Sequence, residues 1–151
     1  MDAFDELCEV LNNTRVLKPL IEQAGEALIG SLRAGGKIMT CGNGGSAADA
    51  LHLSEELIGK YHYPRRPLPA LCLNADVTAL TCIGNDFGFE QIFARQVTAL
   101  ASPNDVLVAF TTSGNSANIL AAFAAARSSG VRTILVAGKN GGRARGLCDH
   151  E

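Results

Sequence analysis

The sequence predicts an α/β domain of three layers, in which a central parallel β-sheet is covered by helices on both faces. Short runs rich in β-branched and aliphatic residues alternate along the chain with longer segments of helical periodicity. Turns rich in glycine or hydroxyl residues follow several of the apolar runs. Regular alternation of strand and helix is typical of parallel sheets. With 151 residues, the chain is expected to form a single domain over residues 1–151.

Residues 2–34 are predicted to be helical, with a break near Asn12-Asn13-Thr14 that makes them a helical hairpin. Apolar side chains from Leu17 to Leu32 recur at helical spacing and form one stripe. Gly35-Gly36 ends the segment. The stripe fits either the domain's own sheet or a partner subunit. The chain is therefore divided into N-terminal helices at 1–35 and an α/β core at 36–151.

The core is predicted to contain four strands and five helices joined by short turns. The predicted strands are 37–41, 68–73, 106–110 and 133–137. The predicted helices are 47–59, 76–83, 89–101, 116–128 and 143–147. A turn is expected at 84–88, because asparagine and aspartate commonly close the backbone between glycines.

The turn from Thr111 to Ser116 is the strongest candidate for binding an anion. It follows a strand and precedes a helix, and it carries hydroxyl groups on Thr111, Thr112, Ser113 and Ser116. Free N–H groups and the helix dipole favour an anion at such a helix start. The alternative is that Ser113 or Ser116 only caps the helix. Four hydroxyl groups in six residues favour phosphate.

A second turn, Gly42-Asn43-Gly44-Gly45-Ser46, also joins a predicted strand to a predicted helix. Its glycines permit close approach of a ligand to the backbone. The spacing G-x-G-x-x-G and the lysine of a P-loop are both absent, so no nucleotide cofactor is expected. Two such turns can face one crevice at the strand ends of a parallel sheet.

His52 and Glu56 are four residues apart on the helix that follows this second turn, so they lie on one helix face. This spacing fits two ligands of one metal ion, or a base beside a helper. The alternative is a solvated pair on an outer face. Glu55 is expected to point elsewhere, toward the surface. The loop carrying Arg65 and Arg66 fits contact with phosphate, contact with a neighbouring subunit, or a solvated loop.

Composition narrows the class of protein further. The net charge is −2 with scattered basic residues, so no nucleic-acid partner is expected. No apolar stretch is long enough to cross a bilayer, and the acidic first residues do not resemble a signal peptide, so we expect no membrane partner and a cytoplasmic location. The five cysteines lack metal-binding spacing, and most are expected to be buried free thiols.

These motifs together resemble the phosphoheptose isomerases of the sugar-isomerase (SIS) domain family. The resemblance covers essentially the whole chain. The matching residues are Gly42 to Ala50, His52, Glu56, Ala79 to Thr81, Ile83 to Phe89, Arg95 to Val97, Thr112 to Ser116 and Gly141-Gly142. The resemblance implies the SIS fold and a homotetramer whose N-terminal helices pack together.

The resemblance also implies an activity. Such enzymes interconvert sedoheptulose 7-phosphate and D-glycero-D-manno-heptose 7-phosphate through an enediol, in bacterial heptose biosynthesis for surface glycans such as lipopolysaccharide. It implies that Glu56 is the catalytic base and that His52 and Glu56 hold zinc, which some members carry. It implies two groups of substrate contacts. Phosphate contacts are Thr111, Thr112, Ser113 and Ser116, and sugar contacts are Asn43, Gly44, Gly45, Asn85 and Asp86.

One departure from the family pattern concerns the end of the sequence. The family continues with a last strand and a C-terminal helix, which supply a glutamine and a histidine to the same site, whereas this sequence stops at Glu151. We expect a truncated portion of a longer protein; the alternative is that this protein has lost part of the site. The alternative function is a non-catalytic SIS tetramer that binds the replication initiator protein or senses a sugar phosphate.

Overall fold

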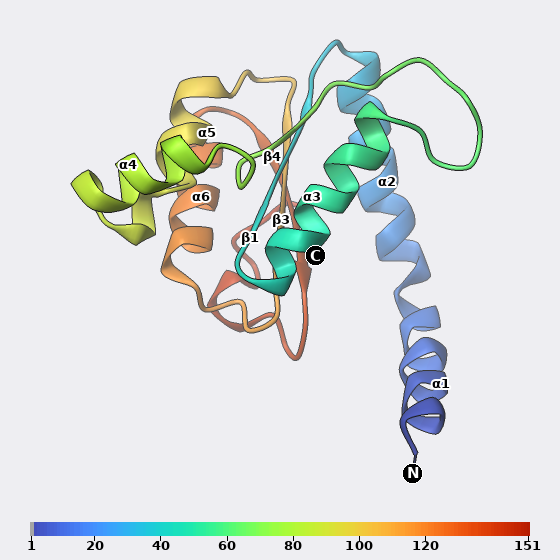
Figure 1. Cartoon of the computed structure of the whole chain (residues 1–151). Helices are drawn as coiled ribbons and strands as arrows, with labels where there is room; N and C mark the ends of the chain where they lie inside the picture. The colour runs from blue at the N-terminus through green and yellow to red at the C-terminus, as the bar shows by residue number, and fades with distance from the viewer. Residues whose placement is uncertain (1) are drawn as a thin grey trace.

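The computed structural model describes residues 2–151, and its centre is a parallel β-sheet (Figure 1). The strands are β1 (Ile38–Gly42), β2 (Ala70–Cys72), β3 (Val106–Thr111) and β4 (Arg132–Ala137). Their order across the sheet is β2-β1-β3-β4, and every neighbouring pair is parallel. The register places Ile38 of β1 beside Ala70 of β2 and Val106 of β3. The predicted parallel sheet is therefore confirmed.

Six α-helices and three short 3₁₀ turns complete the described part of the chain. The α-helices are α1 (Ala3–Thr14), α2 (Lys18–Arg33), α3 (Gly45–Ile58), α4 (Val77–Phe87), α5 (Ala94–Leu100) and α6 (Ala117–Ser128). The 3₁₀ turns are η1 (Arg15–Leu17), η2 (Phe89–Gln91) and η3 (Gly142–Ala144). A helix was predicted at 143–147, but only the turn η3 forms there.

Two hydrophobic clusters hold the helices to opposite faces of the sheet. Side chains alternate between the two faces of a strand. On one face Met39, Leu107 and Leu135 pack with Phe93 and Phe123, from the segment before α5 and from α6. On the other face residues of β1, β3 and β4 pack with apolar residues of α2 and α3. The predicted three-layer arrangement is confirmed.

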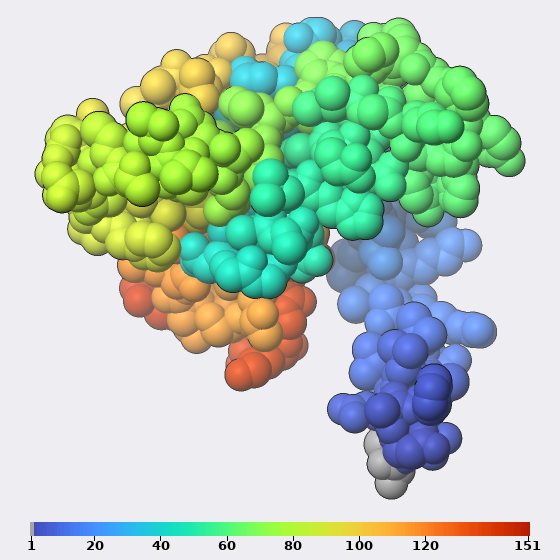
Figure 2. Space-filling model, viewed as in Figure 1, coloured from blue at the N-terminus to red at the C-terminus, as the bar shows by residue number. Residues whose placement is uncertain are grey.

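The N-terminal helices do not form the predicted hairpin. Residues 14, 17 and 18 keep right-handed helical backbone angles, so η1 continues the chain from α1 into α2 without reversing it. The two helices follow one another as a long arm in Figure 1, and Figure 2 shows α1 extending away from the rest of the molecule.

The apolar stripe of this arm is divided between two environments. Ala24, Ala27, Leu28 and Leu32 pack against the sheet, so the second half of α2 covers the domain's own core. Leu17, Leu20 and Ile21 stay exposed, and α1 has no buried residue. The second half of the stripe therefore covers the domain's own sheet, as one alternative predicts. The first half is exposed and is available to a partner subunit, as the other alternative requires.

Two predicted elements around residue 88 differ in the structure. The turn expected at 84–88 is the last turn of α4, which continues to Phe87 before Gly88 (φ +89°) ends it. The guanidinium of Arg95 lies 3.6 Å from the centre of the Phe87 ring, a cation–π contact that favours this helical end. The helix expected at 89–101 is divided into η2 and α5, because the chain bends to bury Ile92 and Phe93.

The amino ends of β1 and β3 are joined by a buried ion pair. The carboxylate of Asp105 accepts hydrogen bonds from the Lys37 ammonium, the Lys37 amide and the Ser102 amide. Burial alone would raise the pKa of Asp105, but the hydrogen bonds and the charge from Lys37, together with the Ser102 amide, lower it overall. This end of the sheet is therefore closed by groups that satisfy one another.

The free edge of β4 is paired over only a short length. His150 forms an isolated parallel bridge with Ile134, and the Leu135 amide donates to the His150 carbonyl at 2.8 Å. Asp149 is fixed by hydrogen bonds from the Thr133 amide and hydroxyl at 2.7 and 2.8 Å.

Among residues 2–151, no helix combines the length and apolar character that a membrane crossing requires.

Candidate active site

Two strand-to-helix turns lie side by side at the carboxyl ends of β1 and β3. The β1–α3 turn contains Asn43, Gly44 and Gly45, and the β3–α6 turn runs from Thr111 to Ser116. The two strands are neighbours, with Gly42 paired to Phe110 directly before the turns. The structure thus brings together the two turns that the sequence analysis selected, at the position where parallel sheets bind ligands.

The hydroxyl groups of the β3–α6 turn are only partly used within the turn. Thr111 is buried, and its hydroxyl accepts a hydrogen bond from the Gly114 amide at 3.2 Å. Ser113 accepts from the Asn115 amide at 3.2 Å. Ser116 occupies the N-cap position of α6, yet its side chain makes no capping hydrogen bond. Helix capping therefore does not account for Ser116.

The backbone of this turn rests on the segment that follows β4. Gly114 has a φ of +65°, and a Cβ atom there would lie 1.8 Å from the carbonyl oxygen of Gly141. The Ala144 amide donates to the Gly114 carbonyl at 2.9 Å, and the Arg143 amide donates to the Asn115 side chain at 3.0 Å. Only glycine fits at position 114, so the hydroxyl turn has one well-supported shape.

The β1–α3 turn is shaped by Gly44 and anchored by Asn74. Gly44 has φ +56° and ψ −122°, a conformation that other residues rarely adopt. The Asn74 side chain pairs with the backbone of Gly42, accepting from its amide at 3.1 Å and donating to its carbonyl at 2.9 Å. Asn74 was not selected from the sequence, since a single asparagine after a strand gives no specific signal.

A reciprocal pair of side-chain amides joins the β1–α3 turn to the start of α6. Asn43 donates to the Asn118 oxygen at 2.9 Å, and Asn118 donates to the Asn43 oxygen at 2.8 Å. Asn118 lies in the first turn of α6 and is buried. It was missed in the sequence analysis, although a polar residue beside Ile119 and Leu120 is the available signal. The predicted contact residue Asn43 therefore has its side chain engaged within the protein.

His52 and Glu56 lie on one face of α3, as their spacing predicts. The His52 Nε2 atom is 3.4 Å from the Glu56 carboxylate and 3.8 Å from that of Glu55. The His52 side chain is 71% exposed and that of Glu56 is 28% exposed, so Glu56 is the more enclosed member. Glu55 is at the surface as expected, but its carboxylate turns toward His52 rather than elsewhere.

A groove of about 630 Å³ connects this helix face to the end of β3. It is lined by His52 and Glu56 together with Phe110, the residue directly before the hydroxyl turn. Aliphatic side chains contribute much of its wall, with Leu53, Leu57 and Val136 among them. The groove therefore places an imidazole and a carboxylate along a partly apolar surface that includes Phe110, the residue before the β3–α6 turn, but none of residues 111–116.

Arg65 fixes the end of α3 that carries Glu56. Its guanidinium donates to the backbone carbonyl of Leu57 at 2.8 Å and also to that of Glu56. Carbonyl groups in the last helical turn lack partners within the helix, and arginine commonly satisfies them. The loop from 61 to 67 is exposed, as expected for a solvated loop, and within it the Arg65 guanidinium also caps the end of α3.

Asn85 and Asp86 lie on the exposed last turn of α4. The Asn85 amide donates to the Asp86 carboxylate at 2.7 Å. The preceding α4 residues Leu80, Thr81 and Gly84 line a hollow of about 420 Å³ with Gly42, Asn43 and Gly44, but neither Asn85 nor Asp86 lines it. Within the described chain, these two predicted contacts remain separate from the two turns.

Cysteine chemistry at the site is not indicated. Cys41 directly precedes the β1–α3 turn, and its burial, with Cys72 nearby, raises the pKa of its thiol far above the ordinary 9.0. A neutral buried thiol packs as a small apolar side chain. Only Cys41 and Cys72 of the five cysteines are buried, so the expectation that most would be buried is wrong.

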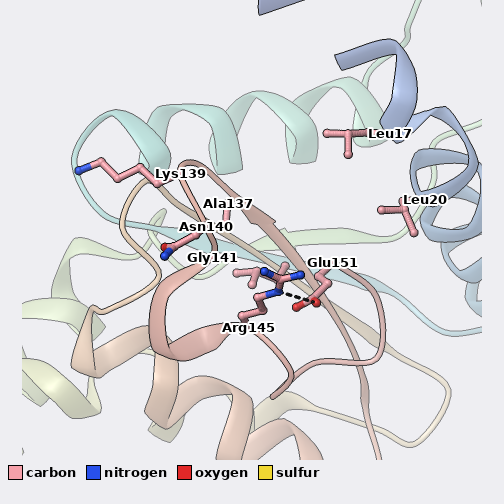
Figure 3. A pocket seen from close by; sticks show the side chains of 9 residues that line it. Leu17, Leu20, Ala137, Lys139, Asn140, Gly141, Arg145 and Glu151 are labelled. Carbon is pink, nitrogen blue, oxygen red and sulfur yellow. Dashed lines mark ion pairs between the residues drawn. The ribbon is translucent and has the colours of Figure 1, made fainter. Parts of the chain in front are cut away.

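A separate hollow of about 280 Å³ lies between the start of α2 and the segment after β4 (Figure 3). Leu17 and Leu20 line one side, and Lys139, Asn140 and Arg145 are on the other. The Arg145 guanidinium is 3.5 Å from the Glu151 carboxylate. None of the predicted catalytic, substrate-binding or metal-binding residues lines this hollow, so it is not part of the candidate active site.

Comparison with known proteins identifies the family to which this site belongs. Residues 2–138 match the family model described as the SIS domain. A phosphoheptose isomerase from Rhodospirillum rubrum is 54% identical over 131 residues, covering 87% of this chain and 70% of the relative. A phosphoheptose isomerase from Solidesulfovibrio magneticus is 53% identical, and the matched region spans 64% of its length.

A solved structure agrees with these relatives. The phosphoheptose isomerase from Neisseria gonorrhoeae superposes with a TM-score of 0.88 at 42% identity, covering 93% of this chain and 74% of that one. A parallel sheet with a hydroxyl turn and a glycine turn at its strand ends therefore places the chain in the SIS-domain family. Within that family the chain belongs to the phosphoheptose isomerases. The comparisons do not favour a non-catalytic relative that binds the replication initiator.

Proposed function

We propose that this chain acts in an aldose–ketose isomerase that interconverts sedoheptulose 7-phosphate and D-glycero-D-manno-heptose 7-phosphate. The single observation that carries the proposal is the groove that joins His52 and Glu56 to Phe110, next to the hydroxyl turn at the end of β3. In this proposal the proton-transfer site and the phosphate site are neighbours, because Phe110 of the groove directly precedes the hydroxyl turn. The names of the close relatives support the same activity.

The phosphate of the substrate is assigned to the β3–α6 turn. Thr112, Ser113 and Ser116 supply hydroxyl groups there, while Thr111 supports the turn by accepting from Gly114. The helix α6 begins at the same place and directs its unpaired amides and dipole toward an anion. The position of His52 is seven residues beyond the start of α3 at Gly45, or about 10 Å along the helix axis. His52 therefore lies about two helical turns beyond the glycine turn.

Glu56 is assigned the proton transfer. In the ketose-to-aldose direction its carboxylate takes a proton from C1, leaving an enediol, and returns the proton to C2. The hydroxyl proton of O1 is lost and O2 gains one, so the C2 carbonyl becomes a hydroxyl, the C1 hydroxyl becomes the carbonyl, and no oxidant or reductant is consumed. A positioned carboxylate is a common general base. The amides of Gly44 and Gly45, at the start of α3, are suited to stabilise negative charge on the enediol oxygen.

A zinc ion fits the donor atoms of this helix face. His52, Glu55 and Glu56 each offer a ligand atom within 4.8 Å of the others. Two donors bound at about 2.0–2.2 Å to a tetrahedral zinc lie about 3.4 Å apart, and His52 and Glu56 are separated by 3.4 Å. When bound, zinc supplies a Lewis acid that polarises the sugar carbonyl. Glu56 and His52 would hold it.

The proposal extends to the assembly and the cellular role. The exposed apolar residues of α1 and the first half of α2 support packing of these helices in a homotetramer. We place the enzyme in the cytoplasm, in heptose biosynthesis for lipopolysaccharide.

The test compares Glu56→Gln with Glu26→Gln, an exposed position on α2 outside the site. Removing the general base should lower turnover of sedoheptulose 7-phosphate by about 10³-fold, while Glu26→Gln keeps the parent rate. Binding of the sugar phosphate, measured by calorimetry, should survive in both variants. Undiminished turnover by Glu56→Gln would exclude Glu56 as the base. A parent chain that neither binds nor converts this sugar would overturn the proposed function.

A further inference from the structure

We infer that Asn118 is a positioning residue, which sets the distance between the two ligand turns by pairing with Asn43. The inference rests on the proposed function, because it assigns the pair a role in binding a ligand that spans both turns. Asn118 itself is not assigned any contact with substrate. Its side chain is enclosed under the turns, with 2% of the residue exposed.

The geometry of the pair is specific to two primary amides. Each side chain donates one N–H to the oxygen of the other, at 2.9 and 2.8 Å. The pair therefore forms a closed ring of two hydrogen bonds across residues that are 75 positions apart in the sequence. An aspartate at either position would keep one bond but would place two oxygens face to face at the other.

The pair connects elements that otherwise approach only through the sheet. Asn43 belongs to the β1–α3 turn, whereas Asn118 belongs to the first turn of α6, two residues after Ser116. Neighbouring strands fix the positions of Gly42 and Phe110, but the turns extend beyond the last strand pair. The Asn43–Asn118 pair joins the β1–α3 turn to the first turn of α6, the helix that directly follows the hydroxyl turn.

The engagement of Asn43 changes its assignment. Family resemblance predicts that Asn43 contacts the sugar, yet its amide oxygen and nitrogen are both committed to Asn118. The groups that this turn offers to a ligand are therefore the backbone amides of Gly44 and Gly45, which are exposed. Asn43 holds these amides in place, and Asn118 holds Asn43.

A ligand that touches both turns should sense this pair, and a ligand that touches one turn should not. Sedoheptulose 7-phosphate spans the two turns in the proposed binding mode, while inorganic phosphate occupies only the hydroxyl turn. The ratio of the two dissociation constants therefore separates positioning from a general loss of stability, which would weaken both ligands alike.

The experiment is a double-mutant cycle of Asn43→Ala and Asn118→Ala, with Asn104→Ala as the matched control. Asn104 also donates a long-range hydrogen bond, to the Ala34 carbonyl at 3.1 Å, but belongs to the opposite end of the sheet. Each single variant should weaken binding of sedoheptulose 7-phosphate about tenfold, and the double variant about tenfold as well, because one shared interaction is lost. Phosphate affinity should change less than about threefold. Asn104→Ala should change neither.

Additive losses in the double variant, or equal losses for both ligands, would overturn the inference. Asn118→Asp keeps the side-chain volume and one bond, so it tests the pair if the alanine variants fold poorly. It should lower sugar-phosphate affinity and spare phosphate affinity, and unchanged binding of both would contradict the positioning role. Urea unfolding of the same variants should show the same coupling without ligand. If the parent does not bind the sugar phosphate, the proposed function and the ligand role of the pair are both overturned. The coupling between Asn43 and Asn118 in urea unfolding can still be measured in that case.

Discussion

The two ends of the β-sheet use polar residues in opposite ways. At the amino ends of β1 and β3, the Asp105 carboxylate accepts three hydrogen bonds and is almost completely enclosed. At the carboxyl ends, Thr112 and Asn115 are exposed, and Ser116 makes no capping bond. The polar groups at the amino end are therefore fully paired within the protein, whereas some hydroxyl groups at the carboxyl end, such as that of Ser116, are not used for capping. Substitutions at the two ends should have separable effects.

Asp105→Ala should give the largest loss of stability. Removing this carboxylate leaves Lys37 and two backbone amides without their buried partner, which we expect to lower the free energy of unfolding by about 3 kcal/mol. Asp76→Ala is the comparison, since Asp76 is an exposed N-cap with one bond, from the Ala79 amide at 3.0 Å, and should cost about 1 kcal/mol. Urea unfolding measures both. Equal losses for the two variants would show that burial of the Asp105–Lys37 pair adds nothing to the free energy of unfolding.

Acid should weaken the same end of the sheet first. The pKa of Asp105 is lower in the folded protein than its ordinary 3.8, so its contribution to stability is complete above that value. The contribution is lost as the pH falls through the folded pKa, because the unfolded chain then binds the proton more readily. Unfolding midpoints of the parent should fall more steeply than those of Asp105→Ala once the pH is lowered below the ordinary pKa of 3.8. If the unfolding midpoints of the parent and of Asp105→Ala depend on pH in the same way, the lowered pKa of Asp105 in the folded protein is contradicted.

Ser116→Ala should have the smallest effect on stability and a clear effect on binding. A serine that caps a helix contributes about 1 kcal/mol, but Ser116 makes no such bond. We therefore expect the free energy of unfolding to change by less than about 0.5 kcal/mol, while affinity for sedoheptulose 7-phosphate falls about tenfold. Calorimetry and urea unfolding of one variant decide between a cap and a ligand contact.

The sequence allowed the sheet and both strand-to-helix turns to be predicted because their signals are local. Apolar runs such as Val106 to Phe110 identify strands, and the hydroxyl and glycine turns follow them directly. The His52–Glu56 pair was placed correctly for the same reason, since helical spacing alone sets it on one face.

The features that could not be predicted depend on tertiary contacts. The hairpin was wrong because nothing local shows that the backbone stays helical through Arg15 to Leu17. The turn at 84–88 was wrong because the contact between Arg95 and Phe87 comes from a later element. Asn118 was missed because its partner, Asn43, is 75 residues away. A polar residue such as Asn43 can be predicted from its own turn, but its hydrogen-bond partner, Asn118, depends on the tertiary fold.

The register of β1 and β3 has a consequence for how the molecule folds. Lys37, which precedes β1, meets Asp105, which precedes β3, across 68 residues, so the central strand pair closes a long loop before its contacts contribute. Non-local parallel pairing of this kind is slow compared with helix formation. The β1–α3 and β3–α6 turns follow directly from these two strands. During folding, helices should therefore form before the two turns come together. Sugar-phosphate binding should therefore appear late in refolding, and it can report completion of the sheet.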